Sequence, residues 1–384
     1  MSAYFDHNST TALHADVLQA MLPFMQHQHG NPTSRHVYGR SARDAIEAAR
    51  AQVASAVNAQ PSQVVFTASG TEANNFAVHG IATGLAHGQI LTSAIEHPCV
   101  SRPALALQSR GWQAVAIQVD AHCQLDMHHL QNLLKAPTNL VSVMLANNET
   151  GAIQDVAQVA TMAREHKAFA HTDAVQALGK IAVSFADLGV HAMTVSSHKI
   201  GGPLGAGALV LDKRIDMQPL LHGGGQEKGL RSGTENVAAI VGFGAACELA
   251  IAHLQSFAKH TQTLRDYLEL GLKKLGAVIF GVNARRLPNT SFFAFQHIEG
   301  ETLVTALDKV GFAVASGSAC SSDSTEPSHV LLAMGVETDL ARGAVRVTLG
   351  ASNTKQQIDA FLVALAIEVK RLAQLSSATQ EFAI

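Results

Sequence analysis

The chain has 384 residues, 47% of them hydrophobic and 15% charged, which is enough to bury a large core. The net charge of −3 without a basic run does not favour nucleic-acid binding, and no apolar stretch reaches the about 18–20 residues of a membrane span. Four scattered cysteines, the absence of CxxC and HExxH spacings and the lack of a signal-peptide pattern favour a cytoplasmic protein without a metal site.

Short apolar runs alternate with helical stretches from about residue 13 to residue 211. This alternation predicts an α/β fold with a mainly parallel sheet that is covered on both faces. The expected strands are 63–67, 89–93, 114–117, 140–145, 168–173 and 191–195, with helices such as 42–57 and 156–166 between them.

The segment Ser69-Gly70-Thr71 follows the first of these strands and opens a helix. Small residues at a helix N-terminus leave backbone N–H groups free, and the helix dipole favours an anion there. Thr71 adds a hydroxyl, so the segment is a candidate phosphate site, although an ordinary capped helix explains it equally well. It is neither GxGxxG nor a Walker motif, so no nucleotide site is predicted.

Polar residues follow two further strands. His97, in Glu96-His97-Pro98, stands where a histidine could stack on a cofactor ring and move protons. Asn147 follows the strand that ends at Leu145, and its amide could bind a cofactor oxygen or a substrate carboxylate. Taken singly, each residue also fits an ordinary loop.

Asp173 and Lys199 follow two successive expected strands. An acid at the carboxyl end of a parallel strand lies where α/β sheets bind their ligands. Lys199 stands between an apolar strand and the turn Gly201-Gly202, and a lysine held in a site is a candidate Schiff-base former. Together they match the needs of pyridoxal 5′-phosphate (PLP), whose aldehyde binds a lysine and whose ring nitrogen pairs with an acid. Alone, Asp173 also fits a helix N-cap, and Lys199 the end of any buried strand.

A long apolar helix is expected over 236–259, and the pattern changes after it. The segments 277–280 and 290–295 alternate as in an antiparallel sheet with one buried face. We therefore expect a large domain over residues 13–258. A smaller α+β domain would comprise residues 1–12 and 259–384.

Cys320 is surrounded by serine, glycine and alanine over 315–324. Structural cysteines are usually buried among hydrophobic residues. A cysteine among small polar residues is expected to be accessible, which is one condition for reactivity. The sequence leaves a structural role for this thiol equally open.

Together these segments resemble the cysteine desulfurases, PLP enzymes of the class V aminotransferase group, in the nitrogen-fixation and iron–sulfur type. The resemblance implies PLP fold type I and covers nearly the whole chain. Its motifs lie in family order at 4–11, 30–36 with 39–40, 96–97, 147–151, 173–176, 196–199, 223–227, 231–236 and 316–320.

The resemblance implies a role for each residue. Lys199 would hold PLP and move the α-proton of L-cysteine, and Cys320 would accept its sulfur as a persulfide. Arg346 would bind the substrate carboxylate, and Thr234 would reach the phosphate of the partner subunit's cofactor, which implies a homodimer. The remaining contacts would be Asn147 to substrate and cofactor, Asp173 to the ring nitrogen, Gln176 to the ring hydroxyl, His97 to the ring face, and Gly70, Thr71, Ser196 and His198 to the phosphate.

The expected reaction converts L-cysteine to L-alanine and passes sulfur to an acceptor protein, either an iron–sulfur scaffold or a sulfur carrier. Two alternatives stay open at this point. A selenocysteine lyase or another class V enzyme would use the same site, and such a lyase could do without the Cys320 thiol. A non-catalytic protein of this fold would not need Lys199, Asp173, His97 and Cys320 together.

Overall fold

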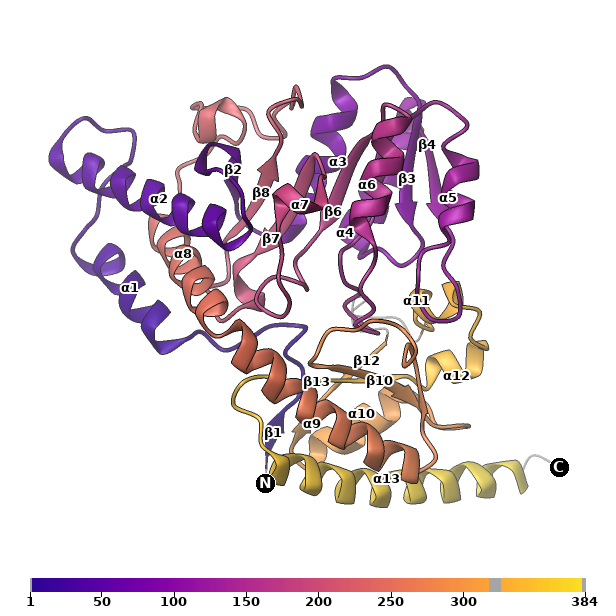
Figure 1. Ribbon diagram of the computed structural model, residues 1–384. Helices are drawn as coiled ribbons and strands as arrows, with labels where there is room; N and C mark the ends of the chain where they lie inside the picture. Colours follow the sequence, from indigo (N-terminus) through magenta and orange to yellow (C-terminus); the bar gives the residue numbers. More distant parts are fainter. Residues whose placement is uncertain (1, 318–325, 382–384) are drawn as a thin grey trace.

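The computed structural model describes residues 2–317 and 326–381, the last six of these as backbone only. Figure 1 shows a larger unit built on a seven-stranded sheet above a smaller unit built on a four-stranded sheet. A further pair of short strands joins the N-terminal residues to the smaller unit.

The seven-stranded sheet has the order β2-β8-β7-β6-β5-β3-β4. Neighbours from β7 to β4 are parallel, whereas β8 runs antiparallel to both β7 and β2. The sheet is therefore mainly parallel, as the alternation predicted. Its strands are β2 Val64–Thr67, β3 Gln89–Ser93, β4 Gln113–Ile117, β5 Thr138–Ser142, β6 Phe169–Asp173, β7 Ala192–Ser196 and β8 Gly207–Leu211.

Helices cover both faces of this sheet because its strands alternate between two hydrophobic clusters. In β8, Ala208 and Val210 belong to the cluster under α2, α6 and α8, and Leu209 to the cluster under α3 and α4. The helices before the smaller unit are α1 Ala15–Gln26, α2 Val37–Ala56, α3 Gly70–Thr83, α4 Pro98–Ala106, α5 Met127–Leu133, α6 Val156–Glu165, α7 Phe185–Leu188 and α8 Val237–Ala252. Short 3₁₀ turns are η1 Pro61–Gln63, η2 Leu107–Arg110, η3 Ser197–Lys199 and η4 Glu227–Gly229.

The prediction of one helix over 236–259 is wrong. The structure has α8 up to Ala252 and a second helix, α9 Leu254–Lys274, at an angle of 68° to it. Phe243 of α8 packs in the core of the larger unit, whereas Leu268 of α9 packs in the core of the smaller one. The break at His253 therefore lets consecutive apolar segments serve two cores.

The four-stranded sheet, in the order β12-β13-β10-β9, is antiparallel as predicted. The expectation of a single buried face is wrong for its strand β10. Phe293 packs with α9 and α13, but Phe292 packs with Ile95 and Met144 of the larger unit, so both faces of β10 are buried. The remaining elements are β9 Val278–Ile279, β10 Thr290–Ala294, α10 Gly300–Lys309, β11 Phe312–Ala313, β12 Ala315–Ser316, α11 His329–Ala333, α12 Thr338–Arg342, β13 Val345–Thr348 and α13 Lys355–Glu381.

Residues 3–11, here called the N-terminal arm, connect the two units. Strand β1 Ala3–Tyr4 pairs in parallel with β11, and the Phe5 ring packs against Phe312 and Phe361 in the smaller core. Further along the arm, the Thr11 backbone N–H donates to the carbonyl oxygen of His198 (3.0 Å), just after β7. The arm thus runs from the smaller core to the strand ends of the larger sheet.

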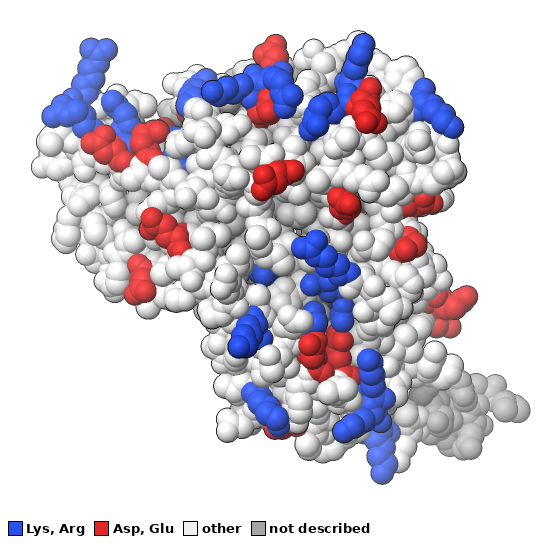
Figure 2. Space-filling model, in the orientation of Figure 1, with Lys and Arg blue, Asp and Glu red and all other residues white. Residues whose placement is uncertain are grey.

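Neither the surface charge nor the length of the helices distinguishes a particular function. Positive and negative side chains are interspersed on the face drawn in Figure 2, which fits the small net charge of −3. In the described part of the chain, no single helix is long and apolar enough to cross a membrane, and α8 and α9 pass that test only as a bent pair, by length and composition.

Candidate functional site

A cavity of about 260 Å³ lies at the carboxyl ends of β6 and β7, against the N-termini of α3 and α4. Most residues predicted from the sequence to form the site line this one cavity. They are Gly70, Thr71, His97, Asp173, Gln176, Ser196, His198 and Lys199.

The sheet register explains why these residues meet. β6 and β7 are parallel neighbours, and Asp173, the last residue of β6, lies beside Thr194 of β7. Ser196 ends β7, and the turn η3 then carries the chain to Lys199. Since parallel strands end at the same edge of a sheet, the acid and the lysine emerge together.

Asp173 is a buried acid with two donors. Its Oδ2 accepts from Asn74 Nδ2 (2.7 Å) and its Oδ1 from the Val175 backbone N–H (2.9 Å). Burial raises the pKa of Asp173, although both hydrogen bonds oppose this shift. A protonated ring nitrogen beside the carboxylate would offset the cost of burying the charge.

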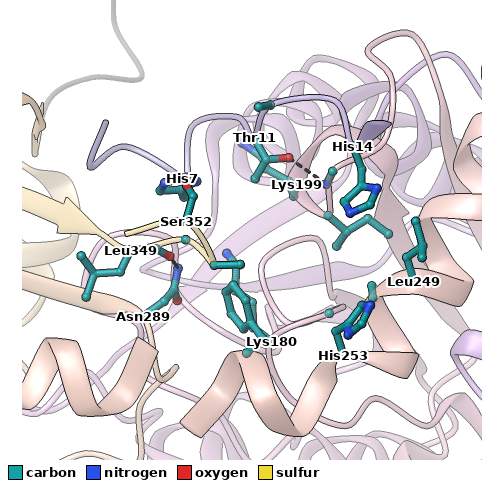
Figure 3. Close-up of a pocket in the computed structure, with 18 of the residues that line it drawn as sticks. His7, Thr11, His14, Lys180, Lys199, Leu249, His253, Asn289, Leu349 and Ser352 are labelled. Carbon is teal, nitrogen blue, oxygen red and sulfur yellow. Dashed lines mark hydrogen bonds between the residues drawn. The ribbon is translucent and has the colours of Figure 1, made fainter. Parts of the chain in front are cut away.

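Lys199 lies between this cavity and the N-terminal arm. Its Nζ donates to the carbonyl oxygens of Asn8 (2.7 Å) and Ser9 (2.6 Å). Lys199 also lines a second cavity of about 720 Å³, in which Figure 3 shows it together with Lys180 and Thr11. We take the smaller cavity as the candidate catalytic site because Asp173 and His97 line it and not the larger one.

Cys99, which no sequence motif singled out, lies in the cavity wall beside His97. His97 is the N-cap of α4, and its Nδ1 accepts from the Cys99 backbone N–H (3.2 Å) and lies 2.8 Å from Cys99 Sγ. Burial raises the pKa of Cys99 to about 12, so at neutral pH it is a thiol that can donate to the same nitrogen. With Nδ1 acting as acceptor, the proton of neutral His97 lies on Nε2.

The end of the cavity at α3 offers an anion site. Ser69 caps the helix by accepting from the Glu72 N–H (3.1 Å), and a Cβ on Gly70 would lie only 3.1 Å from Val175, so glycine keeps this end open. Ser196 Oγ is buried and makes no hydrogen bond to any described residue. A helix N-terminus and an unpaired buried hydroxyl together suit a phosphate.

His198 closes the same end of the cavity. Burial and the nearby Lys199 lower the pKa of His198 to about 4, so its ring is neutral at physiological pH. With the phosphate end at α3, the acid Asp173 and the amine of Lys199, the cavity has the groups that PLP needs. The residues present therefore fit this cofactor.

Arg346 lies beneath the cavity on β13 and is 4% exposed. Its Nη2 binds Asp6 Oδ1 (2.8 Å) and Ser9 Oγ (2.8 Å) of the arm, and its Nη1 donates to the carbonyl oxygen of Asn148 (3.0 Å). Its Nε is buried and, within the described residues, makes no hydrogen bond. Three of the five N–H groups are used in these bonds, so the guanidinium can still donate to a further carboxylate.

Asn147 is fully buried behind the cavity wall. Its Oδ1 accepts from the backbone N–H groups of Glu149 (3.0 Å) and Thr150 (2.9 Å), and its Nδ2 donates to the carbonyl oxygen of Ile95 (3.2 Å). Its neighbour Asn148 lines the cavity instead. In this structure the Asn147 side chain therefore shapes the turn that presents Asn148.

Of two further predicted residues, one lies away from this cavity and the other is outside the described part of the chain. Thr234 is exposed and is not part of the cavity wall of its own chain. Cys320 lies outside the described residues. On the two sides of that gap, Ser316 Oγ donates to Glu301 and Ser328 Oγ donates to the buried Glu149.

The segment 221–236, which carries Thr234, is tied to the larger unit. Arg231 pairs with Glu72 (2.7 Å), and buried Arg50 pairs with Glu227 (2.7 Å). Glu227 Oε2 also accepts from the backbone N–H of Phe66 (2.7 Å) on β2. These contacts hold the segment in place while leaving Thr234 exposed.

Replacing Arg50 by methionine should destabilise the protein by about 3–5 kcal/mol, because the Glu227 carboxylate would stay buried without its partner. Denaturant unfolding measures this loss. The matched control is Arg342→Met, which removes an exposed pair with Asp339 and should cost about 0–1 kcal/mol. Equal losses in the two variants would contradict the structural role given to Arg50.

The comparisons with known proteins show the family of the chain. A family model described as aminotransferase class-V matches residues 3–361. The cysteine desulfurase IscS of Dictyoglomus turgidum is 41% identical over 385 residues, which cover 99% of this chain and 98% of the relative.

Solved structures give a similar result. A NifS-like protein superposes with a TM-score of 0.92 at 38% identity, over 97% of this chain and 100% of that one. A structure described as SspA in complex with cysteine superposes with a TM-score of 0.81 at 29% identity, over 92% of this chain and 100% of that one.

Proposed function

This chain belongs to the class-V aminotransferase family and acts as a cysteine desulfurase, and from this premise we propose how its residues divide the work. Cysteine desulfurases of this family are PLP enzymes that act on L-cysteine and deliver sulfur for iron–sulfur clusters. The observation that most supports our assignment is the convergence of Asp173, His97 and Lys199 on one cavity with a phosphate-binding end.

We propose that Lys199 holds PLP through its amine and that Asp173 faces the ring nitrogen. Gln176 would contact the ring hydroxyl, and His97 would lie on the ring face. The phosphate would be held by Gly70, Thr71, Ser196 and His198. When bound, PLP supplies an electron sink that makes the α-proton of the substrate acidic.

The remaining steps belong to the protein. Arg346 would bind the substrate carboxylate, for which its buried Nε is still available. The Lys199 amine would take the α-proton of the substrate and later return it. Neutral His97 carries its proton on Nε2. It could donate a hydrogen bond from Nε2 to a group of the bound substrate or cofactor that becomes negative during the reaction. The amide of Asn147 stays a predicted contact to substrate and cofactor.

Cys320 would take the sulfur. Its thiolate attacks the sulfur of L-cysteine, a new S–S bond forms on Cys320, and the Cβ–S bond breaks. The bonding electron pair moves to Cβ, which takes up a proton, so that L-alanine and a Cys320 persulfide result. The persulfide then passes its outer sulfur to an acceptor protein.

We propose a homodimer in which Thr234 reaches the partner subunit's phosphate site. The exposed position of Thr234 on an anchored segment supports this arrangement. We also propose the domain division at residue 259, since Phe5 of the arm and Leu264 of α9 share one core. The cytoplasmic location and the identity of the sulfur acceptor stay predictions.

The test is the release of alanine from L-cysteine by the PLP-loaded protein in the presence of a thiol reductant. We expect alanine from the wild type and almost none from Cys320→Ala. Cys247→Ala, which removes a thiol buried in α8, serves as the control and should keep the wild-type rate.

Two other outcomes would contradict parts of the proposed function. Equal alanine from wild type and Cys320→Ala would exclude Cys320 as the acceptor and favour a lyase. No alanine from the PLP-loaded wild type would contradict the proposed substrate.

A further inference from the structure

Lys180 is a buried amine to which the proposed reaction gives no role. It is 3% exposed, and its Nζ donates to Gln176 Oε1 (2.6 Å) and Asn8 Oδ1 (2.8 Å). Both acceptors are neutral amide oxygens. Burial lowers the pKa of Lys180 well below its usual value, and the nearby cations Lys199 and Arg346 act in the same direction. A buried amine held only by amides is costly, so its effect on the residues it holds deserves an explanation.

The chain places Lys180 and Gln176 on the same turn. After β6 the backbone makes successive turns, with the N–H of Ala177 bonded to Ala174 and that of Lys180 to Ala177. Gly179 has φ +73°, and a Cβ there would lie 2.8 Å from Ile200 Cγ2. This local geometry directs Lys180 back toward Gln176, four residues earlier.

Backbone carbonyls determine the orientation of both amides. Gln176 Nε2 donates to the carbonyl oxygen of Asn8 (2.9 Å), and Asn8 Nδ2 donates to the carbonyl oxygen of Asn148 (3.1 Å). A carbonyl can only accept, so each amide must turn its nitrogen toward that carbonyl and its oxygen toward Lys180. Lys180 supplies the donors that both amide oxygens need.

The same network reaches the catalytic lysine. The Asn8 carbonyl oxygen accepts from Lys199 Nζ (2.7 Å) as well as from Gln176. Asn8 is 1% exposed, and Asn289 Nδ2 also donates to its Oδ1 (3.1 Å). Figure 3 shows Lys180, Asn289 and Lys199 around the larger cavity.

We propose that Lys180 is a positioning residue that orients the Gln176 amide, so that an N–H of Gln176 faces the ring oxygen of the bound cofactor. This inference rests on the proposed function, since it concerns the same site. The Gln176 nitrogen has a second N–H beyond the one given to Asn8, and a donor facing the ring oxygen stabilises its ionised form. Without Lys180, the amide oxygen loses its donor and only the Asn8 carbonyl still orients the amide, so an N–H faces the ring oxygen less often and the ionised form loses part of this support.

The test is a pH titration of the absorbance of the bound cofactor, with the full-length protein loaded with PLP and without substrate. In Lys180→Met we expect the apparent pKa of this absorbance to rise by about one unit, a tenfold change in proton affinity. Loss of the positive charge of Lys180 would by itself also raise this apparent pKa. Charged and titratable groups facing Lys180 are Lys199, Arg346, His7 and His198, and all four are kept in this variant.

Two further variants separate the proposed route from a general effect of charge. Lys213→Met removes an exposed lysine and should titrate like the wild type. Gln176→Met should shift the pKa upward by itself, and adding Lys180→Met to it should produce little further change, because Lys180 acts through Gln176.

An unchanged pKa in Lys180→Met, or fully additive shifts in the double variant, would overturn the proposal. If Lys180→Met does not fold, the proposal is tested with Gln176→Met alone. An apparent pKa of the cofactor absorbance equal to that of the wild type would then contradict the proposal. A wild type that develops no absorbance of bound cofactor would instead contradict the proposed function, so the two failures are distinct.

Discussion

Replacing Lys199 by alanine is expected to lower the rate of alanine release from L-cysteine by at least about 10³-fold, because in the proposed mechanism one amine both holds the cofactor and moves the α-proton. The neighbours of Lys199 should be little disturbed. Its Nζ donates to the backbone carbonyl oxygens of Asn8 and Ser9, and its side chain lies at the wall of the cavity. Initial rates at saturating L-cysteine measure the loss.

A small primary amine added to the assay provides a sharper readout of the Lys199 variant. It should restore part of the activity, since the cavity left by the side chain opens on both pockets. Lys213→Ala removes an exposed lysine and serves as the control with an expected wild-type rate. A Lys199→Ala protein that keeps activity within tenfold of the wild type would exclude this lysine as the proton carrier.

Replacing Asp173 by asparagine is expected to lower the same rate by about 10²–10³-fold. The side chains have the same shape, but asparagine has no negative charge to keep the ring nitrogen protonated. Its amide group would also meet the Asn74 Nδ2 that now donates to Asp173 Oδ2. The rate and the uptake of PLP are measured on the same preparation, so that loss of chemistry is separated from loss of binding.

Asp339→Asn is the matched control for Asp173, because it removes the charge of an exposed acid on α12. It should keep the wild-type rate. Full activity in Asp173→Asn with normal cofactor uptake would show that this carboxylate does not face the ring nitrogen.

The sequence was sufficient to locate Asp173 and Lys199 because the rule behind them is local. Each residue ends or follows a recognisable apolar strand, and parallel strands bring their carboxyl ends to one edge. The start of α3 at Gly70 could also be predicted from local sequence, because capping residues indicate a helix N-terminus. The resemblance to a family then supplied the roles that spacing alone left open.

Other features depend on contacts between distant residues and could not be predicted in this way. Lys180 donates a hydrogen bond to Asn8, which lies 172 positions away in the chain. The sequence of neither segment indicates this partner. Strand β8 runs antiparallel to its neighbours because the chain turns back over residues 197–206 after β7. The composition of β8 does not reveal this direction. The buried second face of β10 depends on the larger unit that packs against it.

The N-terminal arm has a consequence for the order in which the protein is made. Asn8 is synthesised 191 positions before Lys199, which donates to its carbonyl oxygen, and 340 positions before Thr348, whose Oγ1 accepts from its backbone N–H. Contacts of such sequence separation form late, because the chain between them must exist and be ordered first. The nascent larger unit can therefore form its sheet before the contacts of the arm with the smaller unit exist. Capture of the proposed cofactor in its final setting is expected only after the residues up to Thr348 have been synthesised.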